Sequence, residues 1–150
     1  MDSDEIARLR RAVARLSRQL NTSATHEGLT PTQASILGVI ASRGPIGLAE
    51  LVEIEGVHPT MLSRVIGKLV ADGLIVRGQD PADLRAITVS ATAAGRKKQA
   101  RMRAERAAVM GQYVAALTPE QERRLVAALP ALEALTSVGD GQVTHEGGRA

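Results

Sequence analysis

Apolar residues recur every three or four positions through most of the 150-residue chain, which is the spacing of one face of an α-helix. The first such stretch is a continuous seam of five apolar residues: Ile6, Leu9, Val13, Leu16 and Leu20. This seam predicts a helix over about residues 4–20, ended by the polar stretch 21–28. The same spacing predicts helices over residues 30–42, 48–54, 57–72 and 93–117, and a last helix that begins near residue 118.

Two of these helices begin with the same local signal. Thr30-Pro31-Thr32-Gln33 and Thr118-Pro119-Glu120-Gln121 each place a capping hydroxyl, a proline at the first helical position and a glutamine three residues after the cap. Gly44-Pro45 ends the helix over residues 30–42, and Ile46-Gly47 is expected to be a short extended link. The Gly-rich, polar stretch 138–150 is expected to be a disordered tail.

Two short runs rich in β-branched residues differ from the helical pattern. Residues 74–77 and 86–90 have the composition of strands, and the loop 78–85 between them is rich in turn residues, with Asp80-Pro81 near its middle. The pattern therefore predicts a β-hairpin.

The stretch 57–72, just before this hairpin, has two different faces. Pro59 suits a first helical position, and Gly73 follows the helix as a residue that tolerates a positive φ. The inward face is apolar: Leu62, Val65, Ile66 and Leu69. The outward face carries small hydrogen-bonding residues and positive charges: Thr60, Ser63, Arg64 and Lys68. Such a helix suits a DNA groove, although an ordinary amphipathic helix with a solvated basic face has the same pattern.

The neighbours of this helix favour the first interpretation. The short helix over residues 48–54 and the turn Glu55-Gly56-Val57 precede it, which is a helix-turn-helix arrangement, and the hairpin after it is a wing. The predicted fold is mainly α with a small β-hairpin wing: a winged helix-turn-helix with additional helices at both ends.

Composition narrows the functional classes. With one Tyr and no Phe or Trp, the core must be built from Leu, Ile, Val and Ala, and the absence of Cys excludes disulfides and thiolate metal sites. No signal peptide and no apolar run of about 18 residues is present, so a cytoplasmic protein without membrane association is expected. The three His lie far apart in the sequence, and there is no nucleophile motif or phosphate loop, so neither an enzyme nor a bound metal or cofactor is expected.

The positive charge is concentrated in one part of the chain. Residues 58–106 hold ten Lys or Arg against four acids, a net charge of +6, within a protein whose total is +3. This distribution is typical of a polyanion-binding module inside a nearly neutral protein.

The order of elements, and three local motifs, resemble the MarR family of bacterial transcription regulators over roughly residues 5–136. The motifs are Leu48-Ala49-Glu50-Leu51 with Gly73-Leu74-Ile75, the wing segment Asp80-Pro81-Ala82-Asp83-Leu84-Arg85-Ala86, and Ala91-Thr92-Ala93-Ala94-Gly95. The wing contains the Asp-any-Arg signature of the family at Asp83 and Arg85. The last motif is similar to the opening of the family's long helix, with Ala91 in place of Leu.

The resemblance implies a division of the chain. Residues 1–29 and 92–137 would form a helical homodimerisation region, and residues 30–91 a winged helix-turn-helix that binds double-stranded DNA at a palindromic operator. The wing arginine, Arg85, would enter the minor groove, and Asp83 would steady its guanidinium. Most members of the family act as repressors.

Three residues depart from the family pattern. His58 stands where Ser is usual, and it would cap the helix, contact a phosphate or recognise a purine. Met61 replaces a small polar residue, and Leu84 replaces a frequent Arg of the wing. The expected DNA-binding residues are His58, Pro59, Thr60, Met61, Ser63, Arg64, Lys68, Asp83 and Arg85.

Two further functional questions follow from the resemblance. Many relatives are released from DNA by small, often phenolic, effectors, and a corresponding pocket for an aromatic or apolar effector would be aliphatic here, with Tyr113 the one aromatic side chain in the sequence. The alternative function is a protein-interaction module that keeps the winged fold without binding DNA. The net charge of +6 over residues 58–106 argues against that alternative.

Overall fold

The computed structural model describes residues 1–141, apart from the side chains of residues 23, 24 and 137–141. Its elements in chain order are α1 (Ser3–Leu20), α2 (Thr22–His26), α3 (Pro31–Arg43), β1 (Ile46–Gly47), α4 (Leu48–Glu55), α5 (Pro59–Ala71), β2 (Ile75–Gln79), β3 (Ile87–Ala91), α6 (Ala93–Ala115) and α7 (Pro119–Gly141). The predicted fold class is confirmed: the protein is mainly helical, with one small antiparallel sheet.

The predicted helix starts are confirmed by their hydrogen bonds. Thr30 and Gln33 form a reciprocal capping box at α3, with Thr30 Oγ1 accepting from the backbone N–H of Gln33 at 3.2 Å. Thr118 and Gln121 form the same pair at α7, at 2.9 and 3.3 Å. These bonds satisfy backbone N–H groups that have no partner inside the helix.

The sheet contains one strand more than the predicted hairpin. Its order is β1–β3–β2, so β3 is the central strand. Val89 of β3 pairs with Ile46 of β1 on one side and with Arg77 of β2 on the other. The link expected at Ile46-Gly47 is therefore the edge strand β1. A two-residue strand carries almost no sequence signal, because its pairing is decided by the partner strand.

The two ends of the chain also differ from expectation. The polar stretch 21–28 contains the short helix α2. Helix α7 runs to Gly141, four residues into the segment expected as a tail, and the rest of that segment lies outside the described residues.

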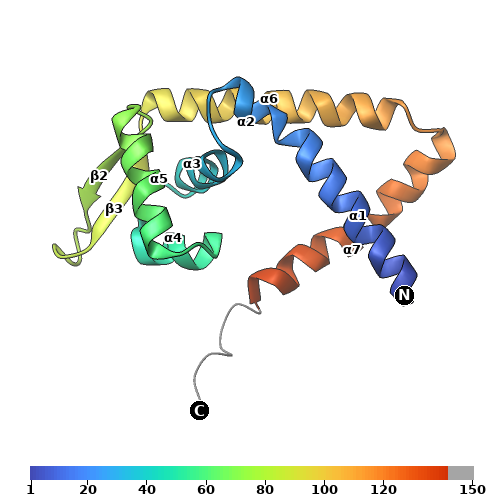
Figure 1. Cartoon of the computed structure of the whole chain (residues 1–150), viewed down its shortest axis with the longest axis horizontal. Coiled ribbons are helices and arrows are strands. Elements are labelled where there is room, and N and C mark those ends of the chain that lie inside the picture. Colours follow the sequence, from blue (N-terminus) through green and yellow to red (C-terminus); the bar gives the residue numbers. More distant parts are fainter. Residues whose placement is uncertain (142–150) are drawn as a thin grey trace, which may run out of the picture.

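The apolar core lies in the winged part of the molecule. Its fully buried side chains come mainly from α3, α4, α5 and the sheet, and Met102 of α6 completes it. Figure 1 shows α6 as the long helix that spans the molecule, with α3, α4, α5 and the hairpin gathered at its first end and α1 and α7 toward its other end. Helix α6 therefore links the winged part to the terminal helices.

Helix α6 begins against the backbone of the winged part. Thr92 caps α6 by accepting from the N–H of Gly95, and its hydroxyl donates to the carbonyl of Gly73 at 2.7 Å. A Cβ placed on Gly95 would lie 2.0 Å from the carbonyl oxygen of Leu74. The glycine of the Thr-Ala-Ala-Gly motif is thus required for close packing of the helix on the strand.

In contrast, α1 and α7 leave apolar side chains uncovered. No residue of α1 is buried. Among the described side chains of these two helices, the exposed large apolar residues are Ile6, Val13, Leu16, Leu125, Val126, Leu129 and Leu135. The seam predicted along the first helix is present and lies largely on the surface of this single chain. Among the described residues, every helix is too short or too polar to cross a lipid bilayer.

Candidate nucleic-acid interface

Helix α5 begins with a turn and a side-chain cap. Gly56 ends α4 in the left-handed region, at φ +60°, and His58 is the N-cap of α5. The backbone N–H of Thr60 donates to Nδ1 of His58 at 3.2 Å. Of the three roles open to His58 from the sequence, the structure identifies helix capping. The Pro at the first helical position is confirmed as well.

The two faces of α5 have the predicted environments. Leu62, Val65, Ile66 and Leu69 are buried in the core. The opposite face is open to solvent and carries Thr60, Met61, Ser63, Arg64 and Lys68, with His58 and Pro59 exposed at the helix start. Helix α5 therefore presents hydrogen-bonding and cationic side chains to solvent, together with one apolar side chain, Met61, which is 43% exposed.

The charge of Lys68 is shared with an acid of the same helix end. Lys68 Nζ lies 2.9 Å from Oδ1 of Asp72, one helical turn further on. An exposed i,i+4 pair of this kind contributes about 0.3–0.5 kcal/mol, so a phosphate can displace the carboxylate. In contrast, Arg64 has no carboxylate partner among the described residues, which leaves its guanidinium fully available.

Gly67 lies between Arg64 and Lys68 on this helix. Apart from its chain neighbours and the nearby backbone of its own helix, a Cβ at Gly67 would meet no atom within 4 Å, so packing does not require a glycine at this position. Gly67 therefore does not serve a close approach of another part of this chain.

The wing is closed by short local hydrogen bonds. The N–H of Asp80 donates to the carbonyl of Ala86 at 3.1 Å, which joins the two ends of the loop. Oδ1 of Asp80 accepts from the N–H of Ala82 at 2.8 Å, and Oδ1 of Asp83 accepts from the N–H of Arg85 at 3.0 Å. Both aspartates therefore form side-chain turns that fix the loop backbone.

This geometry changes the role expected for Asp83. The resemblance implied a contact between its carboxylate and the guanidinium of Arg85, but within the described residues Asp83 meets Arg85 through the backbone N–H instead. Arg85 is exposed, and so is Leu84, at 70%. Asp83 thus sets the direction of the chain at Arg85 and leaves the guanidinium in solvent.

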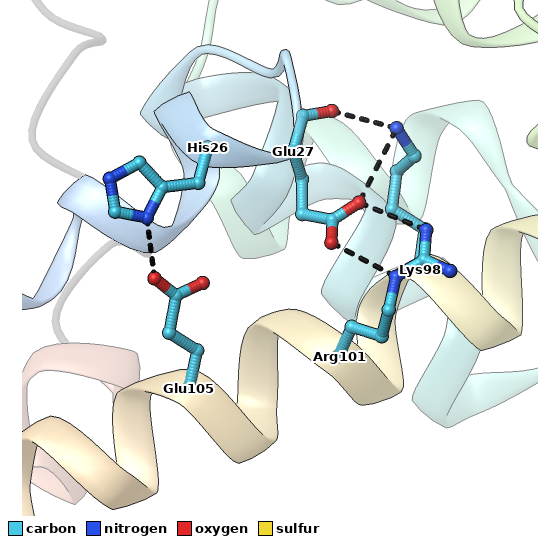
Figure 2. Close-up of polar contacts among 5 residues, drawn as sticks. All are labelled: His26, Glu27, Lys98, Arg101 and Glu105. Atoms are coloured by element: carbon cyan, nitrogen blue, oxygen red, sulfur yellow. Dashed lines mark hydrogen bonds and ion pairs between the residues drawn. The ribbon is translucent and has the colours of Figure 1, made fainter.

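Behind the interface, a group of ion pairs holds α2 against α6 (Figure 2). Nε and Nη2 of Arg101 donate to the two carboxylate oxygens of Glu27 at 2.9 and 3.0 Å, and Nζ of Lys98 donates to the Glu27 carbonyl at 2.7 Å. Nδ1 of His26 lies 2.6 Å from the carboxylate of Glu105. These contacts were not predicted, although Lys98, Arg101 and Glu105 share one face of a helix by their spacing.

The ion pairs affect the protonation of Glu27. The hydrogen bond from Arg101 is the largest cause that lowers the pKa of Glu27 from its ordinary value of 4.5, with Lys98 adding to it. Glu27 in turn raises the pKa of Arg101. Leu29, two residues after Glu27, is the first residue of the buried core. The ion pairs of Glu27 therefore hold the chain where it enters that core.

Two further features bear on ligand binding. A shallow groove of about 380 Å³ lies between α1 and α6, lined by Val13, Leu16, Ser17, Leu20, Asn21 and Arg106. Tyr113 does not line it. Among residues 1–141, no group of three or more His, Asp or Glu lies close enough together to hold a metal ion.

The comparisons with known proteins agree with this architecture. Residues 29–87 match the MarR family model. The HTH-type transcriptional repressor MdtR of Bacillus subtilis is 30% identical over 99 residues, which span 66% of this chain and 64% of that relative's length.

Two solved structures extend the likeness to the terminal helices. The crystal structure of RV1404 from Mycobacterium tuberculosis superposes with a TM-score of 0.77 and 26% identity, covering 89% of this chain and 94% of that one. CouR from Rhodococcus jostii RHA1, solved bound to p-coumaroyl-CoA, has a TM-score of 0.66 and 23% identity over 87% of this chain and 92% of its own. With the wing, the capped helix α5 and the glycine at the start of α6 all in place, the winged part of the chain is a MarR family domain.

Proposed function

We propose that this protein is a dimeric regulator of transcription, a repressor, that binds double-stranded DNA in a sequence-specific manner. One observation carries the proposal: the solvent-exposed face of α5 collects polar and cationic side chains beside an exposed wing, while its opposite face is packed in the core. The relatives support it, since they are transcriptional regulators. In this role the protein acts on cytoplasmic DNA and performs no catalysis.

The contacts divide between two elements. Helix α5 enters the major groove, where Thr60 and Ser63 hydrogen-bond to base edges, Met61 offers an apolar contact to a thymine methyl and Arg64 reads a purine. The wing places Arg85 at the minor groove, where a narrow groove attracts a guanidinium. Lys68 leaves Asp72 for a phosphate, and Asp83 holds the wing backbone.

The terminal helices supply the dimer. Residues 1–29 and 92–137 form the dimerisation region, supported by the uncovered apolar residues of α1 and α7, and residues 30–91 form the DNA-binding region. Two α5 helices related by a two-fold axis then recognise a palindrome with half-sites about 34 Å apart, one turn of the double helix.

The experiment is selection of bound duplexes from a random library, followed by titration of the selected duplex at several salt concentrations. A palindromic motif is expected, with an affinity that falls steeply as salt rises, because neutralised phosphates release counterions. Arg64→Ala is expected to lose about 1–3 kcal/mol and to relax the preference at one base pair per half-site. Absence of salt-dependent duplex binding would establish the alternative, a protein-interaction module.

A small aromatic or apolar effector that releases the protein from DNA is part of this proposal. CouR binds p-coumaroyl-CoA in its solved structure, and in this chain the groove between α1 and α6 is mainly apolar, with Arg106 among its lining residues. Titration of the protein–operator complex with aromatic carboxylates and their CoA thioesters tests this part of the proposal. Release of the DNA by one of these compounds at micromolar concentration supports an effector. If none of them releases the DNA, this part of the proposal is wrong.

A further inference from the structure

The N-cap of α5 determines which nitrogen of His58 carries a proton. A backbone N–H can only donate, so Nδ1 of His58, which receives the N–H of Thr60 at 3.2 Å, must be the unprotonated nitrogen. In a neutral imidazole the proton then lies on Nε2. The cap therefore selects one tautomer, in which the ring has its acceptor toward the helix and its donor at the far end of the side chain.

That donor has no partner in the chain. Across residues 1–141, no hydrogen bond joins Nε2 of His58 to another protein atom, and the residue is exposed. Serine or asparagine would cap a helix equally well or better, but the donors of these shorter side chains lie closer to the backbone than Nε2 of histidine does. A histidine at this position thus adds an outward N–H to the ordinary function of an N-cap.

The outward N–H lies at the end of the surface proposed to meet DNA. Residues at the start of a recognition helix are the ones that reach base edges and the adjacent phosphates. Thr60, Met61 and Ser63, which follow His58, are all exposed on this end of α5. The acceptors that DNA offers there are purine N7 and O6 and the phosphate oxygens.

We propose that His58 is both the cap of α5 and a DNA-contacting residue: Nδ1 holds the helix start, and Nε2–H donates to an acceptor on the bound duplex. The two functions use different atoms of one ring and depend on each other, because the capping bond fixes both the tautomer and the direction of the donor. The second function rests on the DNA binding proposed above, whereas the first belongs to the free protein.

Two substitutions separate the functions. In His58→Asn, the amide oxygen takes the place of Nδ1 and keeps the cap, but the side chain ends short of the Nε2 position. In His58→Gln, the amide N–H₂ reaches the Nε2 position but the side chain is a poor N-cap. His58→Ala removes both and serves as the reference for each.

The measurements are the melting temperature of the free protein and its affinity for the selected operator. His58→Asn is expected to melt as the wild type does but to bind the operator between about two- and tenfold more weakly, the loss of one hydrogen bond. His58→Gln is expected to melt below the wild type, together with His58→Ala, yet to bind better than His58→Ala. Ring ¹⁵N shifts of the free protein are expected to report the Nε2–H tautomer.

The outcomes have distinct meanings. If His58→Asn binds the operator with wild-type affinity, His58 is a cap alone and the proposal is wrong; it is equally wrong if the ring carries its proton on Nδ1. An affinity loss shared by operator and unrelated duplexes identifies a phosphate acceptor, and a loss confined to the operator identifies a base edge, both in support of the contact. If the wild type binds no duplex at all, the proposed function fails, while the melting and ¹⁵N results still decide the tautomer.

Discussion

At the scale of single residues, Gly95 of α6 and Gly67 of α5 have opposite requirements for space. A Cβ on Gly95 would lie 2.0 Å from the carbonyl oxygen of Leu74, whereas a Cβ on Gly67 would meet nothing within 4 Å. A backbone atom cannot move aside as the end of a long side chain can, so the first position excludes even alanine.

Alanine at these two positions is therefore expected to change the free energy of unfolding in opposite directions. Gly95→Ala should lower the free energy of unfolding by about 2–3 kcal/mol through forced displacement of α6 from the strand. Gly67→Ala should raise it by up to about 1 kcal/mol, since alanine is the better helix former in a helix interior. Chemical denaturation of both variants measures the difference. A stable Gly95→Ala protein would show that the start of α6 can shift without loss.

The hydrogen-bond partner of Asp83 is an example of a contact that the sequence does not predict. The family resemblance places its carboxylate at the guanidinium of Arg85, but it accepts from the Arg85 backbone N–H at 3.0 Å. Sequence can place an acid two residues before an arginine, but the choice between backbone and side chain depends on loop dihedral angles that no periodic pattern encodes. For the same reason, the sequence alone does not determine whether the side chain of His58 caps α5.

Asp83→Asn and Asp83→Ala distinguish the two roles. Asparagine offers the same acceptor to the backbone N–H and carries no charge, so it should keep the wing conformation and leave operator affinity equal or slightly raised, with one negative charge fewer near the phosphates. Alanine should weaken binding several-fold. Fluorescence anisotropy at two salt concentrations measures both. Equal loss in both variants would mean that Asp83 acts through its charge on Arg85.

At the scale of elements, the sequence predicts best what local interactions decide. The long helices, the capping boxes at Thr30 and Thr118 and the apolar face of α5 all follow from residues within a few positions of one another. The strand β1 and the helix α2 escape prediction because distant parts of the chain create them. Strand β1 exists through its pairing with β3, and α2 is held by side chains of α6.

The contact between α2 and α6 has a predictable dependence on pH. Hydrogen bonds from Arg101 lower the pKa of Glu27 in the folded protein, so the ionised carboxylate stabilises the fold. That contribution is complete above 4.5, the ordinary value of a glutamate pKa, and is lost as the pH falls through the lower folded value.

Glu27→Gln should therefore be less stable than the wild type at neutral pH, and the difference should disappear in acid. Melting temperatures of both proteins between pH 7 and pH 3 measure this, and Glu53→Gln, on the exposed side of α4, is the matched control for the loss of one carboxylate. A difference that persists unchanged to pH 3 would mean that Glu27 contributes through packing and not through its charge.

At the scale of the whole molecule, the distribution of buried residues indicates that the single chain leaves an apolar interaction surface uncovered. The winged part has a closed core, while α1 contains no buried residue and α7 exposes four large apolar side chains. Exposed apolar surface of this extent marks an interaction site, and its position at the end of α6 remote from α5 leaves the proposed DNA surface free (Figure 1).

Substitution of Ile6 and Val13 by Glu tests the dimer. The two side chains are 55% and 53% exposed in the single chain, and Glu is a good helix former, so the fold of the protomer should be kept. Sedimentation should change from dimer to monomer at micromolar concentration. Operator affinity should fall by several orders of magnitude, because one winged part can then contact only one half-site.

The matched control is Arg8→Glu with Arg11→Glu, two exposed changes on the same helix that leave the apolar seam intact. This variant should remain a dimer and should bind a palindrome cooperatively, with both half-sites protected together. Since α1 lies far from α5 in the fold, any loss of affinity in the Ile6 and Val13 variant must act through assembly. A monomeric variant that still protects both half-sites with wild-type affinity would mean that each protomer binds alone, and the palindrome would then have no basis in a dimer.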